Sequence, residues 1–268
     1  MRARGLDRDG FIRREGGLAL VPKAFAPVVA AAKTAILDSF GPDRLHSGYL
    51  YGSIPRGTAV PGVSDLDMLL ALRHEPTDAD RMAAAALETL LDTRFTQING
   101  AGIGLASTAT LLSELERYDL GWFVACLCTP LIGEDLAAQL PRYRPTSLLA
   151  RETNGNLGDI LPRWRAQLSQ AGTDSDLKTL SRRVGRVLVR TGFTLAMPCW
   201  GGWTSDLGES AAVFGSYYPA RRDQMAIAAE VARANTTDRA VLGMLIDDLG
   251  PWLAAEYLAK HGKKTPRP

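Results

Sequence analysis

Two aspartates separated by one residue, Asp65 and Asp67, begin a segment, DLDMLLAL, that is typical of a buried strand. Because side chains alternate along a strand, we expect both carboxylates on one face, with Leu66 turned to the core. Neighbouring carboxylates repel one another, so a site that keeps both favours a cation between them. Their hard oxygen ligands suit Mg²⁺, which takes its remaining ligands from water and phosphates. The pair therefore predicts a magnesium site.

A glycine turn precedes these aspartates. A strand expected at Gly48 to Tyr51 ends in Gly52-Ser53. The glycine lets the backbone approach a phosphate, and the serine hydroxyl and amide can donate to it. Arg56 follows within one turn, and its planar guanidinium could reach the same anion. The alternative without a ligand is a glycine turn beside two solvated aspartates at a strand end.

The order GS, RG and SDLD within residues 52–67 (GSIPRGTAVPGVSDLD) resembles the signature of the polymerase-beta-like nucleotidyltransferases. The spacing is similar, more closely, to that of the bacterial antibiotic (aminoglycoside-type) and minimal nucleotidyltransferases. The segments VLVRTGFTLAM and LGPWLAAE resemble the helical second domain of that group. The resemblance implies an α/β (α+β) core with a mixed sheet, followed by an all-helical C-terminal domain.

The resemblance also implies an activity. A nucleoside monophosphate would pass from a nucleoside triphosphate, with ATP as the expected donor, to a hydroxyl of a small molecule, and pyrophosphate would leave. The acceptor would be an antibiotic or a biosynthetic intermediate. By analogy Asp65 and Asp67 hold Mg²⁺ as catalytic residues, and Gly52, Ser53 and Arg56 hold the β- and γ-phosphates.

The sequence departs from the family pattern at one point. Active members place a third carboxylate on a later strand, and the matching segment here, QINGAGIGLAS, contains neither Asp nor Glu. Gly102 falls at the expected place, with Asn99 as a neighbouring polar side chain. Asp206, or else Asp119, could supply the missing carboxylate, although either residue also suits a helix N-cap or the surface.

A basic face in the C-terminal half is the second candidate for phosphate contact. Lys178, Arg182 and Arg186 are spaced by four residues and fall on one face of the expected helix. Lys178 or Arg182 resembles the base with which the second domain of the family reaches the triphosphate, and a solvated charged face is the alternative.

Two other functions stay open: a degenerate member that binds a nucleotide for regulation or different chemistry, and an enzyme that modifies a partner protein.

The elements that position these residues follow from periodicity and breakers. A helix is expected over residues 22–40, strands at 48–51, 65–72 and within 95–112, and a helix from Thr77 or Asp78 to Phe95. Prolines at 141 and 145 mark a break. We therefore expect a catalytic core in residues 1–145. A helical bundle in residues 146–268 should complete the substrate cleft.

The composition restricts the classes of molecule that the protein is expected to bind. The 268 residues are 46% apolar and 22% charged, with a net charge of +2, which predicts a nucleotide and a small-molecule acceptor rather than long nucleic acid. The N-terminus lacks the apolar core of a signal peptide, and no run of 18 apolar residues exists, so we expect a cytoplasmic protein without membrane association. Oligomeric state is left open between monomer and homodimer.

The remaining residue types favour structural roles. The three cysteines, in apolar surroundings, are expected to be buried free thiols in a reducing compartment: Cys126, Cys128 and Cys199. Among the histidines, His46 is expected in a loop, and His74 and His261 at the surface. Four aromatic residues surround an expected glycine-rich loop, CWGGWTSDLGESAAVFGSYYP, where they could stack on a base or acceptor, or fill the core: Trp200, Trp203, Tyr217 and Tyr218.

Overall fold

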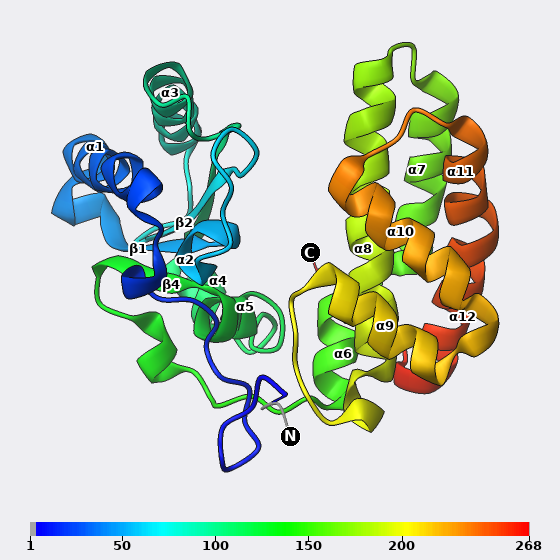
Figure 1. Ribbon diagram of the computed structural model, residues 1–268. Coiled ribbons are helices and arrows are strands. Elements are labelled where there is room, and N and C mark those ends of the chain that lie inside the picture. The colour runs from blue at the N-terminus through cyan, green and yellow to red at the C-terminus, as the bar shows by residue number, and fades with distance from the viewer. Residues whose placement is uncertain (1–3, 268) are drawn as a thin grey trace. The chain divides into compact units, whose positions relative to one another are not determined.

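The computed structural model describes residues 4–267 and divides into two compact units (Figure 1). The sheet unit is Arg13–Tyr143, and the helical unit is residues 144–267 together with residues 4–12. The sequence predicts a boundary between residues 145 and 146, close to the observed one. It does not predict that residues 4–12 belong to the helical unit. Trp203 N donates to Arg4 O at 2.8 Å, and the Arg144 guanidinium lies 4.0 Å from the Phe11 ring centroid.

The sheet unit contains a four-stranded mixed sheet with the strand order β3-β2-β1-β4 (Figure 1). The strands are β1 (Leu45–Tyr51), β2 (Leu66–Leu72), β3 (Ala101–Ser107) and β4 (Thr129–Gly133). β1 pairs antiparallel with β2 and with β4, whereas β2 and β3 are parallel. The structure thereby confirms the expected mixed sheet, and it places the expected third strand at its edge.

Helices cover both faces of the sheet. α1 (Ala26–Arg44) and α3 (Asp78–Arg94) pack on one face and form the larger core with residues such as Leu66. α4 (Thr108–Leu112) and α5 (Leu120–Leu127) cover the opposite face. Of the two caps that the sequence allowed, Thr77 is the N-cap of α3, in a capping box with Asp80.

The stretch Lys23–Arg44, with a mean hydropathy of 1.2, is long and apolar enough to cross a membrane by length and composition only. A helix that packs against a sheet passes the same test. Val28, Ala32 and Ile36 of this stretch are fully buried within the sheet unit. About a third of the apolar window in this stretch is buried, 33%.

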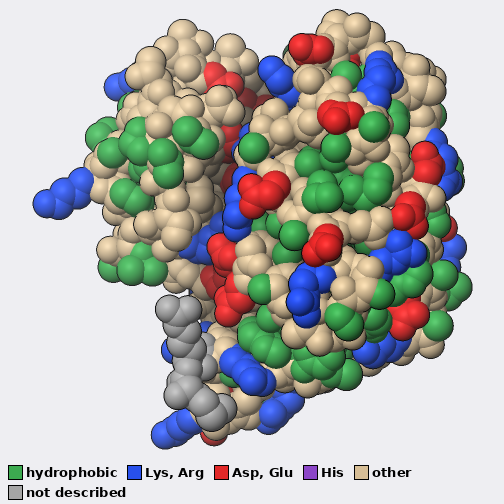
Figure 2. Space-filling view, turned by 45° about the vertical axis from the view of Figure 1, so that its right-hand side comes forward, with side chains coloured by type: hydrophobic (Ala, Val, Ile, Leu, Met, Phe, Trp, Pro, Cys, Tyr) green, Lys and Arg blue, Asp and Glu red, His purple; other side chains and the backbone are tan. Residues whose placement is uncertain are grey.

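The helical unit is built around α8 (Asp174–Trp200), against which α6, α7, α9, α10 and α12 pack. Gly185 of α8 permits the close approach of α10, because a Cβ there would lie 2.6 Å from Ala228 O. Charged side chains of both signs are interspersed with apolar ones over the face shown in Figure 2. The other helices are α6 (Ser147–Asn154), α7 (Leu157–Gln170), α9 (Leu207–Tyr217), α10 (Arg222–Ala234), α11 (Arg239–Met244) and α12 (Gly250–His261).

Candidate functional site

The end of β1 and the start of β2 lie side by side, because the antiparallel register pairs Tyr51 with Asp67. Gly52 consequently faces the Asp67 side chain, and a Cβ at position 52 would lie 2.7 Å from Asp67 Oδ2. Gly52 also has a φ of 82° and a ψ of −152°, a conformation that residues with a Cβ rarely adopt. Glycine is therefore required twice, by the turn and by the carboxylate against it.

Asp65 lies one residue before β2, where pairing with the neighbouring segment continues. Asn99 N donates to Ser64 O at 3.0 Å and Leu66 N donates to Gly100 O at 2.8 Å, an arrangement offset by one residue from the β2–β3 register. We still expect side-chain alternation to put the Asp65 carboxylate on the sheet face of Asp67. Leu66 between them is fully buried in the core on the other face. Both aspartates are half-buried.

The turn after Gly52 is the four-residue helix α2 (Ser53–Arg56). Ser53 begins it, next to the glycine turn. Gly57 ends it in a left-handed conformation with a φ of 75°, which explains the glycine of the RG pair. Arg56 lies at the far end of α2, and its Nη1 pairs with Glu15 Oε2 at 3.5 Å. This ion pair had no signal in the sequence, because its partners are distant along the chain.

The edge strand β3 offers no carboxylate to the pair. Its register sets Gly102 opposite Asp67, and a Cβ at position 102 would lie 3.8 Å from Asp67 Oδ1. The position opposite Asp67 on β3 is thus a glycine with space for a Cβ. The nearest polar side chain on this edge is Asn99, whose Nδ2 donates to Asp65 Oδ1 at 3.3 Å.

Mg²⁺ fits the donors that are present. Among residues 4–267 no group of three or more His, Cys, Asp or Glu side chains could hold a metal ion. The carboxylates of Asp65 and Asp67 remain as candidates, and a turn that carries no side chain at Gly52 lies beside Asp67. This set suits a cation such as Mg²⁺, which is bound through one or two carboxylates plus substrate phosphates. Asp65 and Asp67 would hold it.

The two alternative carboxylates lie in different units. Asp206, in the helical unit, caps α9: Glu209 N donates to Asp206 Oδ1 at 2.7 Å. The capping interpretation of Asp206 is thus confirmed, and its carboxylate is exposed. Asp119, in the sheet unit, directly precedes α5 and is half-buried. A catalytic role for either residue stays a prediction.

Lys178 and Arg182 lie in the first half of α8, which begins with a capping box between Thr173 and Asp176. The Lys178 side chain is exposed, and Arg182 is half-buried. Both belong to the helical unit, as Asp206 does. Their contact with the triphosphate therefore also stays a prediction.

The expected glycine-rich loop is mostly helix, which corrects the sequence interpretation. α8 continues to Trp200 and α9 begins at Leu207, so that only a short connection lies between them. The aromatic rings largely pack together: Trp203 meets Phe193 at 5.5 Å between centroids, and Tyr218 stacks on Phe214 at 5.1 Å. Tyr217, at 42%, is the most exposed of the four aromatic residues singled out in the sequence.

Two expectations for histidines are wrong. His46 lies in β1 rather than in a loop, with Nδ1 3.1 Å from Ser47 Oγ. His261 is buried at the end of α12, with Nδ1 2.7 Å from Ser147 Oγ and Nε2 3.1 Å from Leu195 O. His74 is exposed, as expected.

The cysteines divide into a buried pair and an exposed residue. Cys126 and Cys128 are buried free thiols, as expected, and burial raises the pKa of Cys126 to about 12. Burial also raises the pKa of Cys128. Cys199 is exposed, contrary to expectation, because it lies in the last turn of α8, just past the buried Met197. The two buried thiols are therefore poor nucleophiles at neutral pH.

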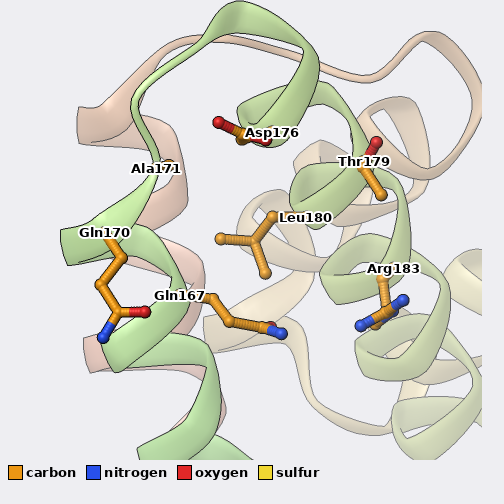
Figure 3. A pocket seen from close by; sticks show the side chains of 7 residues that line it. All are labelled: Gln167, Gln170, Ala171, Asp176, Thr179, Leu180 and Arg183. Atoms are coloured by element: carbon orange, nitrogen blue, oxygen red, sulfur yellow. The ribbon is translucent and has the colours of Figure 1, made fainter.

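A cavity of about 390 Å³ opens at the turn between α7 and α8, in the helical unit (Figure 3). Asp176, its only acidic lining residue, accepts hydrogen bonds from the Thr173 and Gly172 backbone N–H groups at the start of α8. This cavity contains none of the sequence-predicted site residues. The residues that line it are Gln167, Gln170, Ala171, Asp176, Thr179, Leu180 and Arg183.

Comparison with protein-family models and with curated proteins gives no match to this chain. Among solved structures, the fold is similar to that of spectinomycin adenyltransferase AAD(9) from Enterococcus faecialis, crystallised with ATP and spectinomycin. The similarity covers 85% of this chain and 98% of that chain, with a TM-score of 0.49 and 14% sequence identity. It concerns the path of the chain and assigns no role to any residue.

Proposed function

We propose that this protein transfers a nucleoside monophosphate from a nucleoside triphosphate, with ATP as the expected donor, to a hydroxyl of a small molecule. The observation that carries the proposal is the position of Gly52, whose bare backbone faces the Asp67 carboxylate at the end of β1. We expect Asp65 on the same sheet face. A metal-bound phosphate suits a carboxylate pair beside a turn that carries no side chain at Gly52.

The reaction would proceed by displacement at the α-phosphorus. The acceptor hydroxyl oxygen forms a bond to that phosphorus, the bond to the bridging oxygen breaks, and pyrophosphate leaves with the electron pair. Mg²⁺, when bound, would neutralise phosphate charge and align the attacking and leaving oxygens. Asp65 and Asp67 would hold the metal, while Gly52 and Ser53 orient the β- and γ-phosphates.

Four further residues belong to the proposal. Arg56 would have to exchange its ion pair with Glu15 for a phosphate contact. Lys178 and Arg182 would contribute from α8 through their positive charge. Asp206 is the proposed acceptor of the hydroxyl proton, and its capping bond to Glu209 occupies only Oδ1.

The test is release of pyrophosphate by the full-length protein with Mg²⁺, a set of nucleoside triphosphates and a panel of hydroxylated acceptors. We expect release that requires Mg²⁺ and is lost in Asp65→Ala. ATP and spectinomycin, with which the protein of similar fold was crystallised, serve only as the first compounds to assay. No release with any nucleotide across a broad panel would contradict the proposal.

A second candidate function is favoured by Gly102, which leaves the edge strand without a carboxylate opposite Asp67. On this account the site binds a nucleotide for regulation or for different chemistry. Calorimetry that shows tight, Mg²⁺-dependent binding of ATP without turnover would support it over transfer. A site that turns over ATP in the presence of an acceptor would exclude it.

A further inference from the structure

The Asp65 carboxylate has a neighbour that the proposed chemistry does not use. Asn99 Nδ2 donates to Asp65 Oδ1 at 3.3 Å. The backbones of the two segments are joined in the same place, since Asn99 N donates to Ser64 O at 3.0 Å and Leu66 N to Gly100 O at 2.8 Å. The amide therefore comes from a segment that is hydrogen-bonded to the one that carries Asp65.

The chemistry of the two groups decides which way the amide points. An ionised carboxylate only accepts hydrogen bonds, so the NH₂ end of Asn99, and not its oxygen, must face Asp65. A hydrogen bond to one carboxylate oxygen restricts rotation of the carboxylate. Partners of this kind commonly orient the ligands of metal ions and strengthen metal binding.

The neutral charge of the amide matters in this particular site. β3 has Gly102 opposite Asp67, so the carboxylates of Asp65 and Asp67 carry the negative charge. With no third carboxylate to complete the metal site, correct orientation of the two that are present becomes more important. An amide at position 99 orients Asp65 without adding to the repulsion between Asp65 and Asp67.

We propose that Asn99 is a positioning residue, which holds Asp65 in the orientation that binds the nucleotide-associated metal. The inference rests on the proposed function, because it concerns the same metal site. Asn99 acts through the Asp65 carboxylate rather than on the substrate. Its loss should consequently weaken metal binding while the fold is retained.

The experiment measures Mn²⁺ binding to the full-length protein by electron paramagnetic resonance, in the presence of α,β-methylene-ATP. In Asn99→Ala we expect the dissociation constant for Mn²⁺ to rise about tenfold. In Asn99→Gln, which keeps the amide donor, most of the affinity should be retained. Gln97→Ala is the matched control. It removes a side-chain amide from the same loop, but the Nε2 of Gln97 donates to Ala24 O and not to Asp65.

Melting temperatures distinguish the proposed positioning role of Asn99 from a purely structural role. Without metal we expect the wild-type melting temperature in both Asn99 variants, whereas the stabilisation by Mn²⁺ and nucleotide should shrink in Asn99→Ala alone. Unchanged Mn²⁺ affinity in Asn99→Ala, together with lost affinity in Asp65→Ala, would overturn the role of Asn99 and leave the proposed function intact. Wild-type protein that binds no Mn²⁺ with the nucleotide would overturn the proposed function itself.

Discussion

The two units place their candidate residues in different kinds of position. In the sheet unit, the pairing of Tyr51 with Asp67 brings Gly52 against a half-buried carboxylate, where any side chain would collide. In the helical unit, Asp206 caps α9 and Lys178 lies on the exposed surface of α8. The Asp206 carboxylate is therefore accounted for by its cap, whereas Gly52 combines a positive φ with close approach to a carboxylate.

This difference shows which residues carry functional information by themselves. A helix cap already stabilises the protein, so a carboxylate there needs no ligand to account for it. A glycine with positive φ beside a partly desolvated carboxylate costs conformational entropy and solvation. Such a position is retained more readily when a ligand uses it. Substitutions in both units can test whether this difference between the positions is functional.

The largest effect is expected from the metal pair. Asp67→Asn keeps the shape of the side chain but removes its charge, and we expect nucleotidyl transfer to fall by about 10³-fold, because the metal contributes several kcal/mol to the transition state. Asp43→Asn, at an exposed position of the same unit, is the control and should keep full activity. Rates of pyrophosphate release compare the two. Equal activity in both variants would remove Asp67 from the site.

The glycine turn is tested with a matched pair. Gly52→Ala adds a Cβ both at a φ of 82° and 2.7 Å from Asp67 Oδ2, whereas Gly62→Ala meets only the positive φ, 73°, with nothing within 4 Å. Gly62→Ala should lose about 1–2 kcal/mol of folding free energy, and Gly52→Ala should lose more because of the added close contact. In Gly52→Ala alone, displacement of the carboxylate should lower activity about 10²-fold. Urea unfolding and initial rates measure these effects, and equal rates in the two variants would contradict a functional role for the turn.

A carboxylate can be introduced on the edge strand β3 at position 102. Gly102→Asp has room for its Cβ, since the nearest atom is 3.8 Å away, and the added charge should tighten Mn²⁺ binding about tenfold. Without metal, repulsion from Asp67 should make this variant less stable than the neutral control Gly102→Asn. Calorimetry with Mn²⁺ and thermal melting check both effects. Tighter binding by Gly102→Asn as well would show that charge is not the cause.

In the helical unit, a substitution at Asp206 can remove the basic carboxylate and still keep the N-cap of α9. Asparagine caps helices as well as aspartate does, so Asp206→Asn should leave stability nearly unchanged, whereas Asp206→Ala should lose about 1 kcal/mol. If Asp206 accepts the hydroxyl proton, both variants lose activity. Full activity in Asp206→Asn would leave this residue with its structural role only.

The smallest effect concerns pH. Burial lowers the pKa of His261 below its usual value, and nearby Lys260 adds to this, while the hydrogen bond to the Leu195 carbonyl opposes it. The unfolded chain therefore takes up this proton first, and stability should decrease as pH falls through about 6.5. Denaturation at several pH values should show a flatter profile in His261→Gln. The exposed His74→Gln should retain the wild-type profile.

The sequence was sufficient for features with a local cause. An N-cap at Thr77 or Asp78 and a strand that includes Gly102 follow from short-range patterns, and the structure agrees with both. The shared face of Asp65 and Asp67 stays a prediction.

Contacts between distant segments were beyond reach of the sequence. His261 stands in a basic, polar segment that suggests exposure, yet Ser147 and Leu195 enclose it from elsewhere in the helical unit. Glu15 and Arg56 likewise form an ion pair although they are distant in the sequence. Cys199 was misjudged for a different reason, because apolar neighbours at a helix end do not reveal which face the residue occupies.

The most direct test of the metal-and-phosphate site is calorimetric titration of α,β-methylene-ATP into wild-type protein and Asp67→Asn, each with and without Mg²⁺. We expect tight binding only for the wild type with Mg²⁺, and the variant with Mg²⁺ should bind no better than the wild type without it. Equal affinities under all four conditions would mean that nucleotide does not bind through a cation at Asp65 and Asp67, and the account would be contradicted.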